Sequence, residues 1–116
     1  MPEDCIFCKF VSGKIKVDFI YESDNFFAFA DANPKVKGHT LIIPKKHFVN
    51  SMDFPDSLAS ELFEAIKAVA KIRLKEGFEG FNLVQNNFEA AGQKVMHTHF
   101  HILPRKKGDG FRLNGL

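Results

Sequence analysis

Three of the chain's five histidines, His97, His99 and His101, alternate with single residues inside the segment Met96–Arg105. Successive side chains of a β-strand point to opposite faces, so histidines at this spacing share one face if the segment is a strand. Neighbouring imidazoles are then about 6.5 Å apart along the backbone, close enough to contact one phosphate-sized group or one metal ion. Two chemistries fit this arrangement: a metal site, or a histidine that acts as nucleophile or base beside supporting histidines. The simplest alternative is that all three histidines are solvated. We disfavour it because a surface strand has no need of three titratable rings on one side.

The residues between and after the histidines indicate a strand. Thr98, Phe100 and Ile102 favour β structure and would pack the opposite face. Pro104 cannot donate to a strand ladder, so we expect the strand to end there.

A second group of chemically active side chains begins with Cys5 and Cys8, which have the spacing of metal ligands. Four-coordinate zinc needs two more ligands, which His47 and one histidine of the triple could supply. A redox pair would follow a strand, as in thioredoxin-like folds, but nothing strand-like precedes Cys5. We favour structural zinc over redox activity and over unreactive thiols, because zinc would attach an N-terminal helix to the rest of a small domain. A cupin-like metal site is disfavoured, since no carboxylate follows His101 closely.

Size and composition place limits on the function. The 116 residues predict one domain, residues 1–116, and 45% of them are hydrophobic, enough for a single core. A net charge of +2 gives no general electrostatic case for binding nucleic acid or membranes. The acidic N-terminus lacks a signal peptide, and no apolar run reaches the roughly 20 residues that span a bilayer. We therefore expect a cytoplasmic protein.

The elements that must position these side chains follow from periodicity and from turn residues. One long helix is predicted over 55–75, capped by Asp53 or Asp56, ended by Gly77 and buried along a stripe of Leu58, Leu62, Ile66, Val69 and Ile72. A short helix is predicted over 4–12, between a capping Asp4 and a terminating Gly13. The predicted strands are 17–22 and 26–31, which form a hairpin, then 39–44, buried on both faces, then 80–85, and finally the histidine segment.

A polar loop, 86–93, precedes the histidines, and a glycine-rich tail, 106–116, follows them. With neighbouring strands mostly antiparallel, the pattern predicts an α+β fold of about five strands with one long and one short helix.

The chain resembles the histidine triad (HIT) family over nearly its whole length. The residues that carry the resemblance appear in the order typical of the family: Cys5-Ile6-Phe7-Cys8-Lys9, Gly38-His39-Thr40-Leu41-Ile42-Ile43-Pro44-Lys45-Lys46-His47, Ala91-Gly92-Gln93 and His97-Thr98-His99-Phe100-His101-Ile102-Leu103. The resemblance implies a HIT-like fold, a homodimer, and a nucleotide hydrolase or transferase that acts at the α-phosphate of an AMP derivative.

The resemblance also implies residue roles. His99 would be the nucleophile that becomes covalently nucleotidylated, His101 would contact the phosphate, and His97 and His39 would form a supporting pair. Zinc would be held by Cys5, Cys8, His47 and His97. Asp31 would bind the ribose hydroxyls, although an aspartate that caps a turn is an equally good interpretation. Asn86 and Gln93 would lie near the phosphate. The base pocket would be walled by residues that could also be plain core: Ile6, Phe7, Phe10, Ile15, Phe29 and Ala32.

The branch within the family is open. The short chain and the cysteine pair are similar to the Hint-like nucleoside phosphoramidases, whereas Leu103-Pro104-Arg105-Lys106 is similar to the dinucleoside polyphosphate hydrolases. Lys94 stands where those branches usually carry a small hydroxyl residue, so it could contact a phosphate or point into solvent. A zinc-stabilised purine nucleotide-binding module with little catalysis is a further alternative. The sequence has no Walker loop, and we expect no catalytic magnesium.

Overall fold

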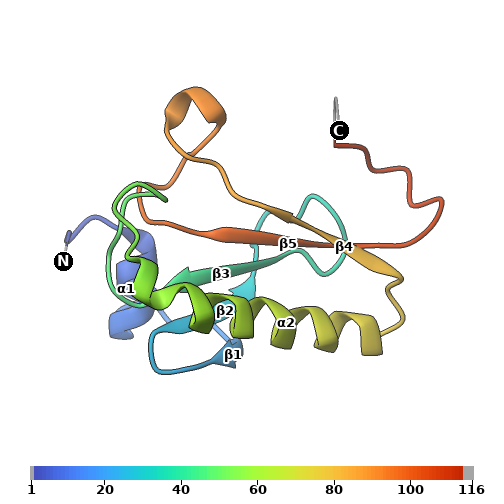
Figure 1. The fold of residues 1–116 in the computed structure, drawn as a ribbon, viewed down its shortest axis with the longest axis horizontal. Helices are drawn as coiled ribbons and strands as arrows, with labels where there is room; N and C mark the ends of the chain where they lie inside the picture. The colour runs from blue at the N-terminus through green and yellow to red at the C-terminus, as the bar shows by residue number, and fades with distance from the viewer. Residues whose placement is uncertain (1, 114–116) are drawn as a thin grey trace.

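The computed structural model describes residues 2–113, which form five strands and two α-helices. The strands are β1 (Phe19–Glu22), β2 (Phe26–Ala30), β3 (Thr40–Pro44), β4 (Gly80–Val84) and β5 (Phe100–Arg105). They make one sheet in the order β1-β2-β3-β5-β4, and every neighbouring pair is antiparallel (Figure 1). The predicted α+β fold, including the hairpin of β1 and β2, is confirmed.

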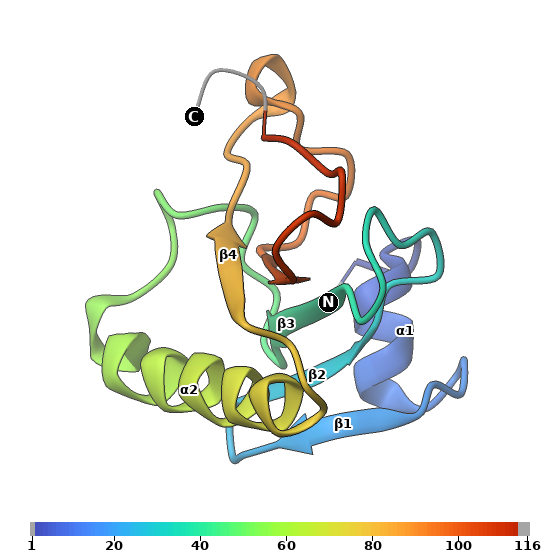
Figure 2. The same cartoon turned by 90° about the vertical axis from the view of Figure 1, so that its right-hand side faces the viewer.

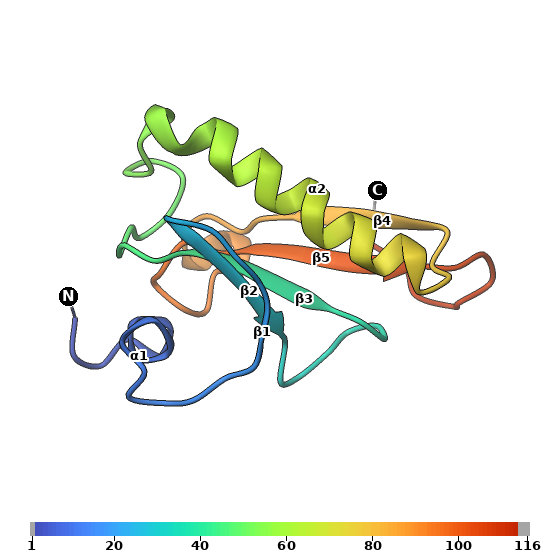
Figure 3. The same cartoon turned by 90° about the horizontal axis from the view of Figure 1, so that it is seen from below.

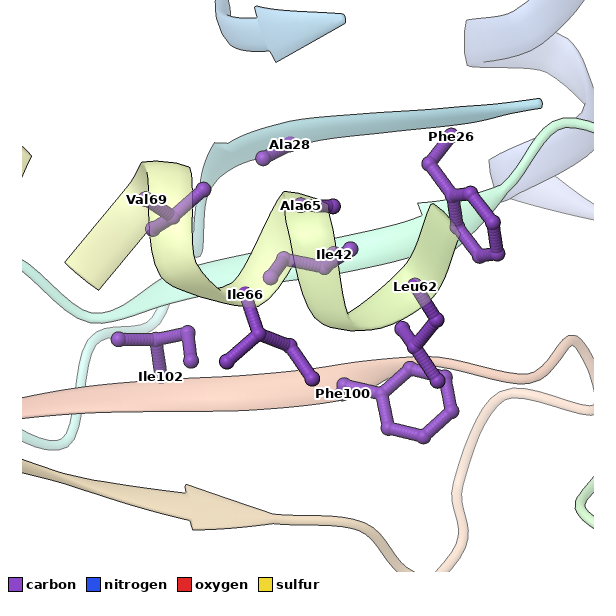
Figure 4. Close-up of a cluster of buried hydrophobic side chains, with 9 residues drawn as sticks. All are labelled: Phe26, Ala28, Ile42, Leu62, Ala65, Ile66, Val69, Phe100 and Ile102. Atoms are coloured by element: carbon purple, nitrogen blue, oxygen red, sulfur yellow. The ribbon is translucent and has the colours of Figure 1, made fainter. Parts of the chain in front are cut away.

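The long helix α2 (Ala59–Lys75) covers one face of the sheet and begins after a 3₁₀ turn at Asp56–Leu58. Leu62, Ile66 and Val69 of the predicted stripe are buried, whereas Leu58 and Ile72 are only half-buried. Figure 4 shows the core that Leu62, Ile66 and Val69 form with side chains of β2, β3 and β5. Ala65 is also buried, and its small side chain lets the helix approach the sheet closely.

The short helix α1 (Ile6–Ser12) lies on the opposite face of the sheet (Figure 3). Its buried side chains, Phe7 and Cys8, pack with Phe27, Phe29, Leu41 and Ile43 of the sheet. All five residues of β3 are buried, as predicted for a strand covered on both faces.

Both predicted N-terminal helix caps are wrong. Cys5, rather than Asp4, caps α1, and its Sγ accepts a hydrogen bond from the Cys8 N–H at 3.4 Å. Neither Asp53 nor Asp56 caps α2, since no side-chain cap bond is made at its N-terminus or at that of the preceding 3₁₀ turn. The Asp53 carboxylate accepts instead from the backbone N–H groups of Val49 and Asn50. Gly13 does end α1, with φ +81°.

The histidine strand is shorter at its start and longer at its end than predicted. β5 begins at Phe100, so His97 and His99 lie in the segment before it, where the Thr98 N–H donates to the Phe48 carbonyl. Pro104 stays within the strand. The Glu79 N–H donates to the carbonyl of Arg105, so the nitrogen of Pro104 faces the other way, toward the chain that precedes Thr40, the first residue of β3. No ladder bond is lost there.

Two segments complete the walls of the functional region. The loop between β4 and β5, with a 3₁₀ turn at Glu89–Ala91, projects from the sheet (Figure 1). The tail after β5 lies on the same side of the sheet as α1 (Figure 2). Arg105 holds this tail by donating to the Asp109 carboxylate and to the carbonyl of Phe111. Positions 114–116 of the predicted tail lie outside the described residues. Within 2–113, no helix is long and apolar enough to cross a membrane.

Candidate active site and metal centre

A cavity of about 700 Å³ lies on the α1 side of the sheet. Three histidines at two neighbouring strands line it: His39 just before β3, His99 just before β5, and His101 within β5. Most of the predicted nucleotide-binding residues line the same cavity: Ile6, Phe7, Phe10, Phe29, Asp31, Ala32 and Asn86. Ile15 does not line it and is 40% exposed.

His99 is buried with its ring held in one orientation. Its Nδ1 lies 2.8 Å from the carbonyl of His97, and because a carbonyl can only accept, Nδ1 carries the proton. The neutral ring therefore presents an unprotonated Nε2. Burial lowers the pKa of His99, which favours this neutral form at pH 7. The edge of the Phe7 ring packs against the imidazole, with ring centroids 5.2 Å apart.

His39 and His101 form a chain of hydrogen bonds that determines both tautomers. The Lys35 backbone N–H donates to His39 Nδ1 at 3.1 Å, so the proton of a neutral His39 is on Nε2. That Nε2–H donates to His101 Nδ1 at 2.9 Å, which leaves the proton of His101 on its own Nε2. Burial lowers the pKa of both residues, that of His101 to about 4, so the chain is neutral at pH 7.

The carboxylate of Asp31 serves two purposes at once. Oδ1 accepts from the Asn33 N–H at 2.9 Å, as expected of an aspartate that caps a turn. Oδ2 lies 3.4 Å from His39 Nε2, and the residue lines the cavity. Asp31, His39 and His101 are close enough to be considered as a metal site. The Lys35 N–H argues against that, because His39 Nε2 carries a proton and has no lone pair for a metal.

Gln93 lies behind the cavity wall rather than on it, because its amide is occupied by backbone groups. Nε2 donates to the carbonyls of Val49 at 2.6 Å and Val95 at 3.1 Å, and Oε1 accepts from the Phe88 N–H at 2.8 Å. The residue is 2% exposed and does not line the cavity. Gln93 therefore stabilises the loop between β4 and β5 through hydrogen bonds to backbone groups.

A separate cluster brings together Cys5, Cys8, His47 and His97. The Sγ of Cys8 lies 3.3 Å from His47 Nδ1 and 3.5 Å from His97 Nδ1, Cys5 Sγ lies 3.4 Å from His97 Nδ1, and the two Nδ1 atoms are 3.2 Å apart. Ligands of tetrahedral zinc, with bonds of about 2.0–2.3 Å, are separated by about 3.3–3.8 Å. The donor set and its spacing therefore fit zinc.

His97 is prepared to be a ligand. Its Nε2–H donates to the Pro44 carbonyl at 2.8 Å, so its lone pair is on Nδ1 and faces the cysteines. Burial lowers its pKa to about 4 and keeps it neutral. His97 lies in this cluster and not beside His39, so the supporting pair implied by the resemblance is instead formed by His39 and His101. The carbonyl of His97 still orients His99, which links the cluster to the cavity.

Among the lining residues that were not predicted from the sequence are Lys35, Leu41, Phe111 and Leu113. The two tail residues reach the cavity only because Arg105 folds the tail back. Its guanidinium also lies over the Phe111 ring, 5.0 Å from the ring centroid. Basic and aromatic residues in a glycine-rich tail were the sole sequence signal for this contact.

Comparisons with known proteins give matches over most of this chain. The sequence pattern of the HIT domain matches residues 12–108. A protein named adenosine 5′-monophosphoramidase from Schizosaccharomyces pombe is 40% identical over 101 residues, which cover 87% of this chain and 74% of that protein. The crystal structure of a HIT family member from Bacillus subtilis has a TM-score of 0.87 and 46% identity, covering 96% of this chain and 80% of that one. A zinc-bound histidine triad protein from Mycobacterium smegmatis has a TM-score of 0.89 and 35% identity, covering 94% and 80%.

Proposed function

We propose that this chain, which belongs to the HIT family, is a nucleotide hydrolase that cleaves an AMP derivative at the α-phosphate, with His99 as nucleophile. The observation that carries this proposal is the tautomer of His99, which presents an unprotonated Nε2 in a cavity large enough for a nucleotide. A 5′-phosphoramidate is the first substrate to consider, since the Schizosaccharomyces pombe relative is named a monophosphoramidase.

The reaction proceeds in two steps. Nε2 of His99 attacks phosphorus, a P–N bond forms, and the bond to the leaving group breaks with its electron pair on that group. An amine leaving group takes up one proton from the solvent as it departs. Water then attacks the phosphohistidine, its oxygen stays on the phosphate of AMP, one proton returns to the solvent, and His99 returns to its neutral form. His101 Nε2–H is positioned to donate to a phosphoryl oxygen, and the His39 Nε2–H holds His101 in the required tautomer.

The remainder of the cavity suits a nucleoside. Phe7, Phe10 and Phe29 supply apolar walls for a purine base, with the rings of Phe10 and Phe29 edge to face at 5.1 Å. Asp31 keeps one carboxylate oxygen free of the Asn33 turn, and this oxygen can accept from ribose hydroxyls. Asn86 lies on the wall beside Gly92 and can donate to a phosphate.

Replacing the nucleophile tests the proposal. His99→Ala should remove turnover of adenosine 5′-phosphoramidate, while thermal unfolding and AMP binding by calorimetry show that the fold and cavity remain. Lys37→Ala, an exposed change on the loop before β3, should retain full activity. Substantial turnover by His99→Ala contradicts the proposal. Tight AMP binding by the unmodified chain, with no hydrolysis of any AMP ester or amide, favours the binding-module alternative.

The Cys5, Cys8, His47 and His97 cluster is proposed to hold one structural zinc ion. Zinc would crosslink α1 to the segment before β5 and so stabilise the wall that Phe7 contributes to the cavity. The zinc-bound relative from Mycobacterium smegmatis supports this assignment. The chemistry at His99 needs no step at the metal.

We also propose that the chain is a single HIT domain, residues 1–116, and that two copies pair into a homodimer. β4 is an edge strand, and an unpaired strand edge is a template for pairing with another chain. Apolar side chains beside this edge are exposed: Phe81 at 39% and Leu83 at 41%. Pairing of two β4 edges would cover them and extend the sheet across both copies. A cytoplasmic location stays a prediction.

A further inference from the structure

We propose that Lys35 and Lys94 form a binding site for an anionic leaving group, so that these two side chains set the preference of this chain between AMP derivatives with a charged and with a neutral leaving group. This inference rests on the proposed function, because it concerns the group that departs when His99 attacks phosphorus. It assigns a role to two lysines that the reaction described above leaves unused.

The two lysines reach the cavity from separate loops. Lys35 lies between β2 and β3, Lys94 lies between β4 and β5, and both line the cavity together with His99 and His101. The backbone of Lys35 is fixed by its hydrogen bond to His39. Its positive charge also contributes to the lowered pKa values of His39 and His101, as expected of an ammonium group close to those rings.

The anchor for Lys94 is the neighbouring residue. Gln93 is buried and bonded to three backbone groups, so the chain position from which Lys94 extends is well defined. The next residue, Val95, lines the cavity as well. The side chain of Lys94 is exposed, as required of a group that must meet a ligand at the cavity mouth.

The charge balance of the cavity favours an anion. Its lining includes two ammonium groups, those of Lys35 and Lys94, and one carboxylate, that of Asp31. The Asp31 carboxylate lies beside Asn33 and His39, where it is proposed to meet the ribose hydroxyls. Among residues 2–113, neither lysine takes part in an ion pair. One ammonium group can offset the charge of the α-phosphoryl group, and the second remains for the leaving group.

The chemistry balances without a further reactant. As Nε2 of His99 bonds to phosphorus, the bridging P–O bond breaks and its electron pair leaves with the sulfate or phosphate. An oxyanion departs without taking up a proton, whereas an amine must be protonated. Lys35 and Lys94 would stabilise the charge that grows on the departing oxygen. Hydrolysis of the phosphohistidine then yields AMP as before.

Three AMP substrates undergo the same attack at the α-phosphate but differ in the charge of the leaving group. Adenosine 5′-phosphoramidate releases ammonia, adenosine 5′-phosphosulfate releases sulfate, and diadenosine triphosphate releases ADP. The readout is the ratio of kcat/KM for each anionic substrate to kcat/KM for the phosphoramidate. Each alanine variant loses a contact between an ammonium group and an oxyanion at a partly exposed site. We therefore expect Lys94→Ala and Lys35→Ala each to lower this ratio about five- to tenfold.

Matched controls keep the interpretation specific. Lys94→Arg retains the charge and should keep the ratio within about threefold. Lys37→Ala removes an exposed lysine from the same loop as Lys35 and should not change it. The preference for anionic substrates should also shrink at about 1 M salt, where the screening length falls to about 3 Å. A loss confined to the phosphosulfate or to diadenosine triphosphate identifies which oxyanion the site accepts.

The outcomes distinguish this inference from the proposed function. Hydrolysis with an unchanged ratio in both alanine variants overturns the lysine site and leaves the hydrolase intact. If the unmodified chain hydrolyses none of the three substrates, the proposed hydrolase function is wrong. The lysine site is then tested by nucleotide binding alone. A lysine site predicts that ADP binds about five- to tenfold more tightly than AMP, and that Lys35→Ala/Lys94→Ala removes the difference. Equal affinities for the two nucleotides would overturn it.

Discussion

Replacing Gln93 by alanine should destabilise the fold, because the structure uses this side chain as a brace. The change removes two donors and one acceptor, and it leaves the carbonyls of Val49 and Val95 and the N–H of Phe88 without their partner. Each polar group left unsatisfied in a buried setting costs about 1–3 kcal/mol. Phe88 and Val49 are themselves 57% and 39% exposed, so water can reach part of this backbone. The expected loss is about 2–4 kcal/mol in the free energy of unfolding.

The backbone of Phe88 adds to the argument. Its φ of +72° is in the left-handed region, which a bulky residue rarely adopts. Both the side chain and the backbone N–H of Gln93 bond to Phe88 and help to keep it there. Without the amide, the loop can relax and release some strain. The expected loss in the free energy of unfolding therefore lies toward the lower end of the range, about 2 kcal/mol.

Guanidinium denaturation of Gln93→Ala measures the effect directly. Lys94→Ala, one residue further on and exposed, is the matched control and should stay within about 0.5 kcal/mol of the unmodified chain. Gln93→Glu keeps an acceptor but loses both donors, so its stability should also fall. A loss below about 1 kcal/mol in Gln93→Ala, combined with a raised KM, would refute the bracing role and favour direct substrate contact.

Three other predictions concern pH, metal and assembly. Burial holds the pKa of folded His101 at about 4, whereas the unfolded residue takes up a proton near 6.5, so its contribution to stability is lost between those values as pH falls. After allowance for its partial exposure, this should reach about 1–3 kcal/mol, and His101→Gln should have a shallower pH slope in denaturation midpoints. Metal analysis should find about one zinc per chain, and Cys8→Ser or a chelator should lower both zinc content and Tm; an equally stable metal-free preparation would exclude a structural role. Leu83→Lys should shift the mass found by light scattering from dimer to monomer, and a monomeric unmodified chain would rule out the proposed pairing.

Much of the fold could be predicted from the sequence because its main signals are local. Continuous apolar residues in 41–43 identified a strand buried on both faces, and helical spacing identified α2. Cap residues were harder to predict. Asp53 has the right chemistry for a helix cap, but its carboxylate bonds to backbone N–H groups in the preceding turn. Competition between nearby acceptors of this kind depends on the path of the loop, which composition does not reveal.

The site could be predicted in its residue types but not in its internal connections. The four possible metal ligands and the cavity histidines were all named from spacing and resemblance, and the structure brings both groups together. Spacing alone placed the three histidines on one strand face. In the structure, the segment before β5 leaves the ladder, so His97 faces the cysteines while His101 meets His39. That division depends on contacts far apart in the chain, such as that between Pro44 and His97.

A single-turnover reaction with adenosine 5′-phosphoramidate tests the central claim most directly. The protein is mixed in excess over substrate, quenched at short times and analysed by intact mass and by peptide mass. The account predicts AMP release and a transient adenylyl adduct on the peptide that carries His99, with neither in His99→Ala. AMP release without any adduct, an adduct on another residue, or turnover that survives the loss of His99 would contradict it.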